Sequence, residues 1–194
     1  MKSDIVLAGV GGQGILTIAA IIGQAAVSQG IHVKQSEVHG MAQRGGSVLA
    51  HLRLSSKPLK SDLIELGSAN VVLGMEPMES LRQLPYLAAA GVLVSNTTPI
   101  CNIDDYPELS AIIKELEKFP RSAVIDADEL AKAAGSPRAA NMVLLGAISN
   151  FLEFPQQLLT DTISEMFSRK GEAIVQANLK AFEAGRQCSA KLKA

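Results

Sequence analysis

The chain has 194 residues and a formal net charge of −1; 47% of the residues are hydrophobic, 19% charged and 4% aromatic. This length suffices for one well-buried domain and is short of two ordinary ones, so we predict a single domain over residues 1–194. The balanced charge excludes an electrostatic surface for nucleic acid or an acidic membrane. The apolar stretches are too short or too interrupted by glycine to span a bilayer, so we expect a cytoplasmic protein without membrane contact.

The chain contains two cysteines, Cys101 and Cys188, which lie far apart in the sequence. Neither belongs to a C-x-x-C pair, the spacing typical of iron–sulfur and structural zinc sites. We therefore expect no metal site, no iron–sulfur cluster and no disulfide framework in this chain, and a reducing compartment.

The N-terminal region predicts a β-α-β unit. Residues 5–8 form a short apolar run that ends at Gly9, as expected for a buried strand. Residues 13–29 have helical periodicity, and Gly30 stands where a helix C-cap is expected. Residues 31–36 alternate like a second strand. Such a unit implies a parallel pair of strands with a right-handed crossover.

The middle of the chain alternates strands and helices. A glycine-rich segment at 37–46 precedes an alternating strand pattern at 47–54, and residues 77–90 read as a helix. Further short aliphatic strands are expected at residues 70–75, 92–95 and 123–126. We predict an α/β fold: a Rossmann-like, open, mostly parallel sheet with helices on both faces.

The C-terminal third is predicted to be helical. Ser136 and Pro137 suit the N-cap and first position of a helix. Residues 141–151 are apolar on most sides and indicate a buried helix, and amphipathic helices are expected near 157–167 and 172–187.

The strongest local motif is the GVGGQG turn that follows the first strand and opens the first helix. Glycines there permit a tight turn and a close backbone approach to an anion, and the helix N-terminus adds N–H donors. We predict a phosphate, diphosphate or carboxylate contact at Gly9, Gly11, Gly12, Gln13 and Gly14. The alternative is that the glycines only allow the helix to pack tightly on the sheet.

A second candidate segment is SEVHGMAQRGG at 36–46. In a parallel sheet it leaves from the same edge as the glycine turn, where ligand crevices form. Glu37, His39 and Arg44 are therefore candidates to converge on the same ligand, with Arg44 as a bidentate partner for an anion. The alternative is a solvated surface role for each; a lone histidine such as His51 is more often structural.

Glu37 also opens a second functional hypothesis. It lies about 20 residues past the last glycine of the turn, where dinucleotide enzymes keep an acid for the ribose. This spacing favours a stand-alone NAD(P)- or nucleotide-binding dehydrogenase. However, the chain shows no recognised catalytic motif and little length for a catalytic domain, so the catalytic residues stay unassigned.

Both glycine-rich segments together resemble the gamma-type domain of 2-oxoacid:ferredoxin oxidoreductases, in particular the small subunit of the indolepyruvate type. The stretch RAANM at 138–142 fits the same subunit, and the resemblance spans nearly the whole chain. It implies a subunit of an enzyme that oxidatively decarboxylates a 2-oxoacid, indolepyruvate or another aryl or keto acid, to an acyl-CoA.

The resemblance also implies cofactors and partners. The complex would use thiamine diphosphate, Mg²⁺, iron–sulfur clusters and coenzyme A, none of them bound by this chain alone in the isolated state. A large alpha subunit would carry thiamine diphosphate and the clusters, and ferredoxin would accept the electrons. The isolated chain is expected to be inactive.

Overall fold

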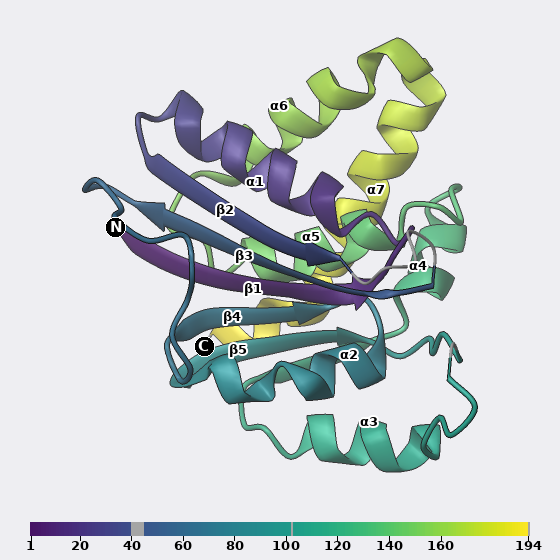
Figure 1. Ribbon diagram of the computed structural model, residues 1–194. Coiled ribbons are helices and arrows are strands. Elements are labelled where there is room, and N and C mark those ends of the chain that lie inside the picture. The colour runs from purple at the N-terminus through teal and green to yellow at the C-terminus, as the bar shows by residue number, and fades with distance from the viewer. Residues whose placement is uncertain (40–44, 102, 194) are drawn as a thin grey trace.

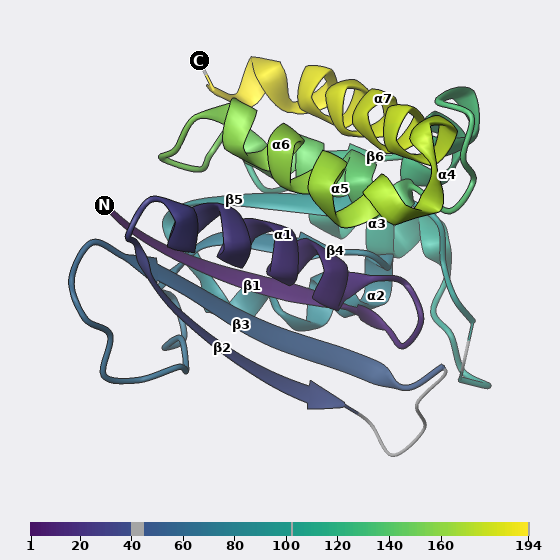
Figure 2. The ribbon, with the colours of Figure 1, turned by 90° about the horizontal axis from the view of Figure 1, so that it is seen from above.

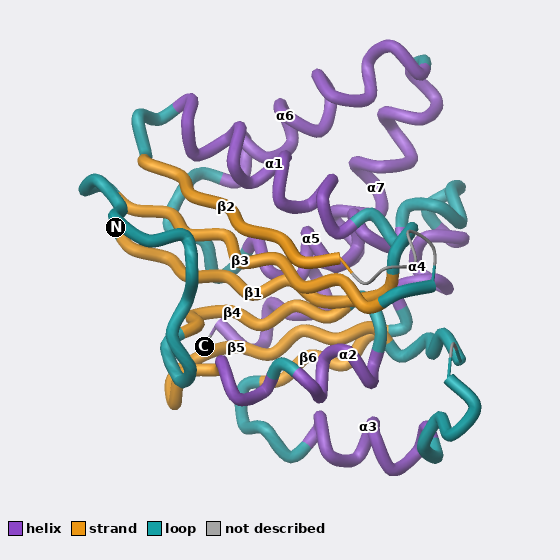
Figure 3. Tube along the Cα trace, in the orientation of Figure 1, coloured by secondary structure: helices purple, strands orange, loops and turns teal. Residues whose placement is uncertain are grey.

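The computed structural model describes residues 1–39, 45–101 and 103–193. The described strands form one sheet of six strands in the order β2-β3-β1-β4-β5-β6 (Figures 1 and 3). The strands are β1 (Lys2–Val10), β2 (His32–His39), β3 (Ser47–Ser55), β4 (Ala69–Gly74), β5 (Leu87–Asn96) and β6 (Ser122–Ile125).

The sheet is mostly parallel, as predicted, with β3 as the exception. Strands β1, β4, β5 and β6 pair in parallel, whereas β3 pairs antiparallel with both β1 and β2. The predicted direct pairing of the first two strands is therefore wrong: β3 lies between them. A short connection joins β2 to β3 as an antiparallel hairpin, and β3 pairs along its whole length with β1, so it occupies the edge of β1 that β2 was expected to take.

Helices cover both faces of the sheet, as predicted. They are α1 (Ile15–Ser28), α2 (Pro77–Arg82), α3 (Leu109–Glu117), α4 (Ala127–Ala133), α5 (Ala140–Ser149), α6 (Gln156–Phe167) and α7 (Glu172–Ser189). Helices α2 and α3 lie on one side, and α1, α5, α6 and α7 lie together on the other (Figures 1 and 2). None of the helices in the described residues combines the length and apolar character needed to cross a membrane.

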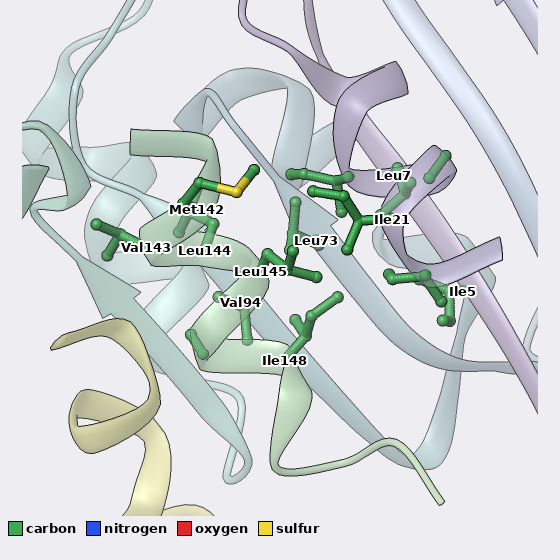
Figure 4. Packing of buried hydrophobic residues seen from close by; sticks show 14 of the residues in the cluster. Ile5, Leu7, Ile21, Leu73, Val94, Met142, Val143, Leu144, Leu145 and Ile148 are labelled. Carbon is green, nitrogen blue, oxygen red and sulfur yellow. The ribbon is translucent and has the colours of Figure 1, made fainter. Parts of the chain in front are cut away.

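The core has two layers, because successive strand residues point to opposite faces. On the side of α1 and α5 the central strands contribute fully buried aliphatic side chains: Ile5, Leu7, Leu73 and Val94. Figure 4 shows Leu73 and Val94 beside the apolar side chains of α5, and Ile5 and Leu7 near Ile21 of α1. The intervening Val6, Val72 and Leu93 pack on the other side with Ile112 and Leu116 of α3.

Helix α5 is buried from Ala140 to Ile148 and packs closely on α7. A Cβ atom on Gly146 would lie 1.8 Å from the carbonyl oxygen of Phe182, and one on Gly185 would lie 1.7 Å from that of Val143. Glycine at both positions therefore lets the two helix backbones touch. This contact holds α5 and α7 against each other, and Asn141 near the N-terminal end of α5 lies beside Gly14 of the glycine turn.

The C-terminal helices near 157–167 and 172–187 are confirmed, but other helix predictions need correction. The helix predicted over 77–90 ends at Arg82, and a 3₁₀ turn leads into β5 at Leu87. Pro85 cannot donate a hydrogen bond within a continuing helix. Ser136 and Pro137 form a turn, and α5 begins only at Ala140. Helices α3 and α4 were not expected from the sequence.

Candidate ligand-binding site

The glycine turn joins β1 to α1 at the carboxyl edge of the parallel strands. Gly12 and Gly14 have φ angles of +102° and +86°, a region that favours glycine. A Cβ on Gly9 would lie 2.9 Å from that of Met75, and one on Gly14 would lie 2.5 Å from the Asn141 amide nitrogen. Gly9 and Gly14 thus allow the turn to pack closely on Met75 and Asn141. The alternative interpretation of the motif, in which the glycines serve packing alone, holds for these two positions.

Gly12 differs from its neighbours. A Cβ built there meets no described atom within 4 Å, so backbone conformation alone requires the glycine and the space beside it is open. Gly14 is the N-cap of α1, and no side chain among the described residues caps this helix or places an acid in its first turn. The turn therefore presents an open approach to a helix N-terminus, where anions are stabilised.

Gln13 has a structural contact on each side. Its Oε1 accepts the N–H of Val10 at 2.7 Å, and its Nε2 donates to the carbonyl of Met75 at 2.9 Å. The side chain thus ties the end of β1 to the end of β4. Its predicted contact with a ligand remains a prediction, but these polar atoms already hold the turn in shape.

Two cavities meet at Gly12. One, of about 310 Å³, is mainly apolar and is lined by Val10, Ile15, Leu16 and Val48. The other, of about 350 Å³, lies on the side of β4 and β5. An extended ligand that crosses Gly12 would meet an apolar wall on one side and polar groups on the other.

The polar cavity is lined by Asn96, Asp128, Arg138 and Asn141. Arg138 is exposed, and among the described residues no carboxylate lies within ion-pair distance of it. The amide of Asn141 lies 3.5 Å from the carbonyl oxygen of Gly14. A guanidinium and an amide thus stand beside the turn, where they can bind an anionic group.

Asn96 makes the wall of this cavity rigid. Its Nδ2 donates to the carbonyl of Met75 at 3.3 Å and to Asp128 Oδ2 at 2.8 Å. Its Oδ1 accepts the N–H groups of Thr97 and Ala127. All the hydrogen-bonding capacity of this amide is used within the protein, so its role is to hold the ends of β5 and β6 together.

A third cavity, of about 260 Å³, continues from the polar one toward α6 and α7. Arg138 and Asn141 border both, and Lys170 and Asn178 line the far side. The Lys170 ammonium lies 5.0 Å from the ring centre of Phe167. Two cations, Arg138 and Lys170, therefore line these neighbouring cavities, together with one carboxylate, that of Asp128.

The second candidate segment, residues 36–46, contacts the glycine turn through its backbone. The N–H of Gly11 donates to the carbonyl of Gly46 at 2.9 Å, so this segment and the glycine turn share one edge of the sheet. Arg44 and the side chain of His39 lie outside the described residues. Glu37 is exposed on β2 and accepts from the Gln35 amide at 3.3 Å.

Other titratable groups lie away from the turn. His51 has the structural role expected of it: Nδ1 accepts the N–H of Ile64 at 3.0 Å, and the ring meets Tyr86 edge-on. Burial and a hydrogen bond to Glu76 raise the pKa of Tyr106, so its hydroxyl stays protonated and fastens the segment after β5 to the start of α2.

The residues of the polar wall were not predicted from the sequence. Asn96 ends β5, and Asp128 follows β6, so the rule that ligands bind at the carboxyl ends of parallel strands points to both. Arg138 and Asn141 belong to the stretch RAANM that carried the resemblance. The sequence signal for Arg138 and Asn141 was their position near the start of a predicted helix.

Comparison with known proteins places the chain among redox enzymes. The family described as pyruvate ferredoxin/flavodoxin oxidoreductase matches residues 4–188. The chain is 39% identical to indolepyruvate oxidoreductase subunit IorB of Archaeoglobus fulgidus over 95% of this chain and 94% of the relative. The IorB of Pyrococcus horikoshii is 38% identical, with 94% and 93% covered.

Solved structures show the same fold. The 2-oxoglutarate:ferredoxin oxidoreductase of Magnetococcus marinus superposes with a TM-score of 0.78 at 24% identity, over 98% of this chain and 31% of the longer relative. The gamma subunit of a keto/oxoacid ferredoxin oxidoreductase from Geobacter sulfurreducens gives a TM-score of 0.70 at 23% identity, with 97% and 99% covered.

Proposed function

Because the chain belongs to the pyruvate ferredoxin/flavodoxin oxidoreductase family, we propose that it is the small subunit of an oxidoreductase that acts on indolepyruvate or another aryl or keto acid. The observation that carries this proposal is the match at 37–39% identity to indolepyruvate oxidoreductase subunits over nearly their whole length. The more distant relatives are also subunits of 2-oxoacid oxidoreductases, which include ketoisovalerate oxidoreductase and 2-oxoglutarate synthase.

The glycine turn and its polar wall, in this proposal, hold the anionic part of coenzyme A. The N-terminus of α1 and the guanidinium of Arg138 provide two kinds of anion contact beside the open space at Gly12. The relative from Magnetococcus marinus was solved with 2-oxoglutarate, coenzyme A and succinyl-CoA bound, which supports this ligand class. The residues of this chain would bind and orient the ligand.

The redox groups, in this proposal, belong to a large partner subunit. Both cysteines are exposed and unpaired, and the described residues contain no group of three or more His, Cys, Asp or Glu side chains placed to hold a metal ion. Thiamine diphosphate with Mg²⁺ would supply the decarboxylation chemistry there, and iron–sulfur clusters would pass the electrons to ferredoxin. The complex as a whole would be cytoplasmic.

The alternative of a stand-alone NAD(P)-dependent dehydrogenase is not supported. In a dinucleotide fold the acid for the ribose ends the strand beside the glycine turn. Here β3 lies between β1 and β2, which places Glu37 two strand spacings, roughly 9–10 Å, from the strand that leads into the turn.

A reconstituted complex of this chain with its partner tests the proposal. Gly12→Val should raise the KM for coenzyme A, because the added side chain enters the open space in front of the turn. Gly30→Val is the matched control, since Gly30 also has a positive φ (+69°) and open surroundings but lies at the far end of α1. Equal effects of the two variants would contradict a ligand at Gly12.

Two arginine variants test the anion contact. Arg138→Met and Arg44→Lys should each raise the KM for coenzyme A about tenfold or more, because a charged hydrogen bond is worth about 1.5–3 kcal/mol and an ammonium cannot replace a bidentate guanidinium. Arg121→Lys, just before β6 at the opposite edge of the sheet, is the control. An unchanged KM in both test variants would show that the crevice does not bind coenzyme A.

A further inference from the structure

A buried carboxylate lies on the opposite face of the sheet from α1. Glu79 of α2 is only 2% exposed. Its Oε2 accepts the hydroxyl of Ser47 at 2.6 Å, and its Oε1 accepts Arg82 Nη1 at 2.7 Å. Burial of a charged carboxylate is costly unless it is paired and hydrogen-bonded, and here one partner is the first residue of β3.

Glu79 is not the cap of its own helix. Glu76 is the N-cap of α2 and accepts the N–H of Glu79 at 2.8 Å. The Glu79 carboxylate contacts Ser47 and Arg82 instead of capping the helix. Its contact with Ser47 therefore joins α2 to a strand that is 32 residues earlier in the chain.

Ser47 is directly linked to the glycine turn. It is the register partner of Val10, the last residue of β1, and the preceding Gly46 accepts the N–H of Gly11 at 2.9 Å. Any shift at the start of β3 therefore moves the backbone that leads into Gly12. Gln13 supports the turn from β4, and the Ser47–Glu79 contact supports it from β3.

We infer that Glu79 is a positioning residue of the ligand site: through Ser47 it holds the start of β3, and thereby the backbone of Gly11 and Gly12, in the conformation that receives the ligand. The inference rests on the proposed function for its ligand, coenzyme A. Its structural part concerns only the mobility of the glycine turn and is testable in the full chain alone.

Hydrogen exchange of the full chain gives the first test. Ser47→Ala removes the hydroxyl that donates to Glu79, and Ser47→Thr keeps it. Ser55→Ala is the matched control, because Ser55 lies on the same face of β3 at the other end and accepts the N–H of Lys57 at 3.0 Å. We expect faster amide exchange in residues 9–14 for Ser47→Ala, the original rate for Ser47→Thr, and no change for Ser55→Ala.

Kinetics of the reconstituted complex give the second test. Ser47→Ala and Glu79→Gln should raise the KM for coenzyme A about fivefold, the equivalent of one ordinary hydrogen bond, with little change in kcat. Ser47→Thr should restore the KM. A general loss of folding would instead lower the amount of active complex and leave the KM of the remainder unchanged.

The outcomes separate the two proposals. If Gly12→Val raises the KM and Ser47→Ala does not, Glu79 has no positioning role. If neither variant changes the KM, while exchange in residues 9–14 still becomes faster in Ser47→Ala, the assignment of coenzyme A to the turn is wrong and the mechanical link stands. Equal exchange in Ser47→Ala and Ser55→Ala overturns the inference whatever the kinetics show.

Discussion

Replacement of a glycine between α5 and α7 should strongly destabilise the protein. In Gly185→Ala the new Cβ would lie 1.7 Å from the carbonyl oxygen of Val143. Non-bonded carbon–oxygen contacts are favourable near about 3.3 Å, so α7 must withdraw by roughly 1.5 Å. A gap of that size forfeits much of the dispersion energy along the contact, which includes the fully buried Phe182.

The magnitude follows from two opposing effects. Overpacking costs about 1–3 kcal/mol and more where backbone must move, whereas Gly→Ala in a helix gains about 1 kcal/mol. We expect a net loss of about 2 kcal/mol in the free energy of unfolding, or a Tm lower by about 4–8 °C. Urea unfolding followed by circular dichroism measures it.

Gly23→Ala provides the matched control for this prediction. Gly23 is also helical, in α1, but a Cβ there would meet Val33 at an ordinary 3.7 Å. This variant should be stabilised by up to about 1 kcal/mol. If Gly185→Ala were as stable as Gly23→Ala, the two helices would not touch at this glycine, and the reasoning about how α5 is held would fail.

Three further predictions concern the rest of the molecule. Arg53→Met should cost about 3 kcal/mol in urea unfolding, because the carboxylate of Asp4, 1% exposed and 2.7 Å from Arg53 Nε, then keeps only the largely exposed ammonium of Lys2 at 3.2 Å; a loss below about 1 kcal/mol would contradict this. Burial, with the nearby Arg53, lowers the pKa of His51, so the stabilisation from its neutral ring is complete above about pH 6.5 and is lost as the pH falls through the folded-state pKa. The urea midpoint should then drop more steeply with acid in the original chain than in His51→Gln, and parallel curves would refute the assignment. The purified single chain should contain no stoichiometric iron or acid-labile sulfide and should not oxidise 2-oxoacids, which metal analysis and an acceptor-reduction assay will check.

The glycine turn and the strand and helix beside it were predictable from the local sequence. A strand, a glycine-rich turn and a helix that follow one another are set by contacts over about 25 residues, and the motif identified all three. The C-terminal helices were found for the same reason, since apolar periodicity reports which side of a helix is buried. The separate requirements of Gly9, Gly12 and Gly14 were not visible, because they depend on Met75, Asn141 and open space.

The wall of the candidate site depended on tertiary structure. Asn96, Asp128 and the RAANM stretch with Arg138 and Asn141 come from three separate segments, and no local pattern says that they surround Gly12. The Ser47–Glu79 contact likewise depends on tertiary structure. Its hydroxyl and its carboxylate lie in different elements, and only the packing of α2 on the sheet brings them within 2.6 Å.

The sequence by itself determined the α/β class, the glycine turn at the end of β1 and the family, because these are written in local periodicity and in short contiguous motifs. Only the tertiary structure decided that β3 lies between β1 and β2. Strand order is a choice among distant pairing partners, and apolar strands of similar length satisfy one another's hydrogen bonds almost equally well. Because β3 lies between β1 and β2, Glu37 of β2 is kept away from the strand that leads into the turn, whereas Gly46 and Ser47 lie beside the end of that strand.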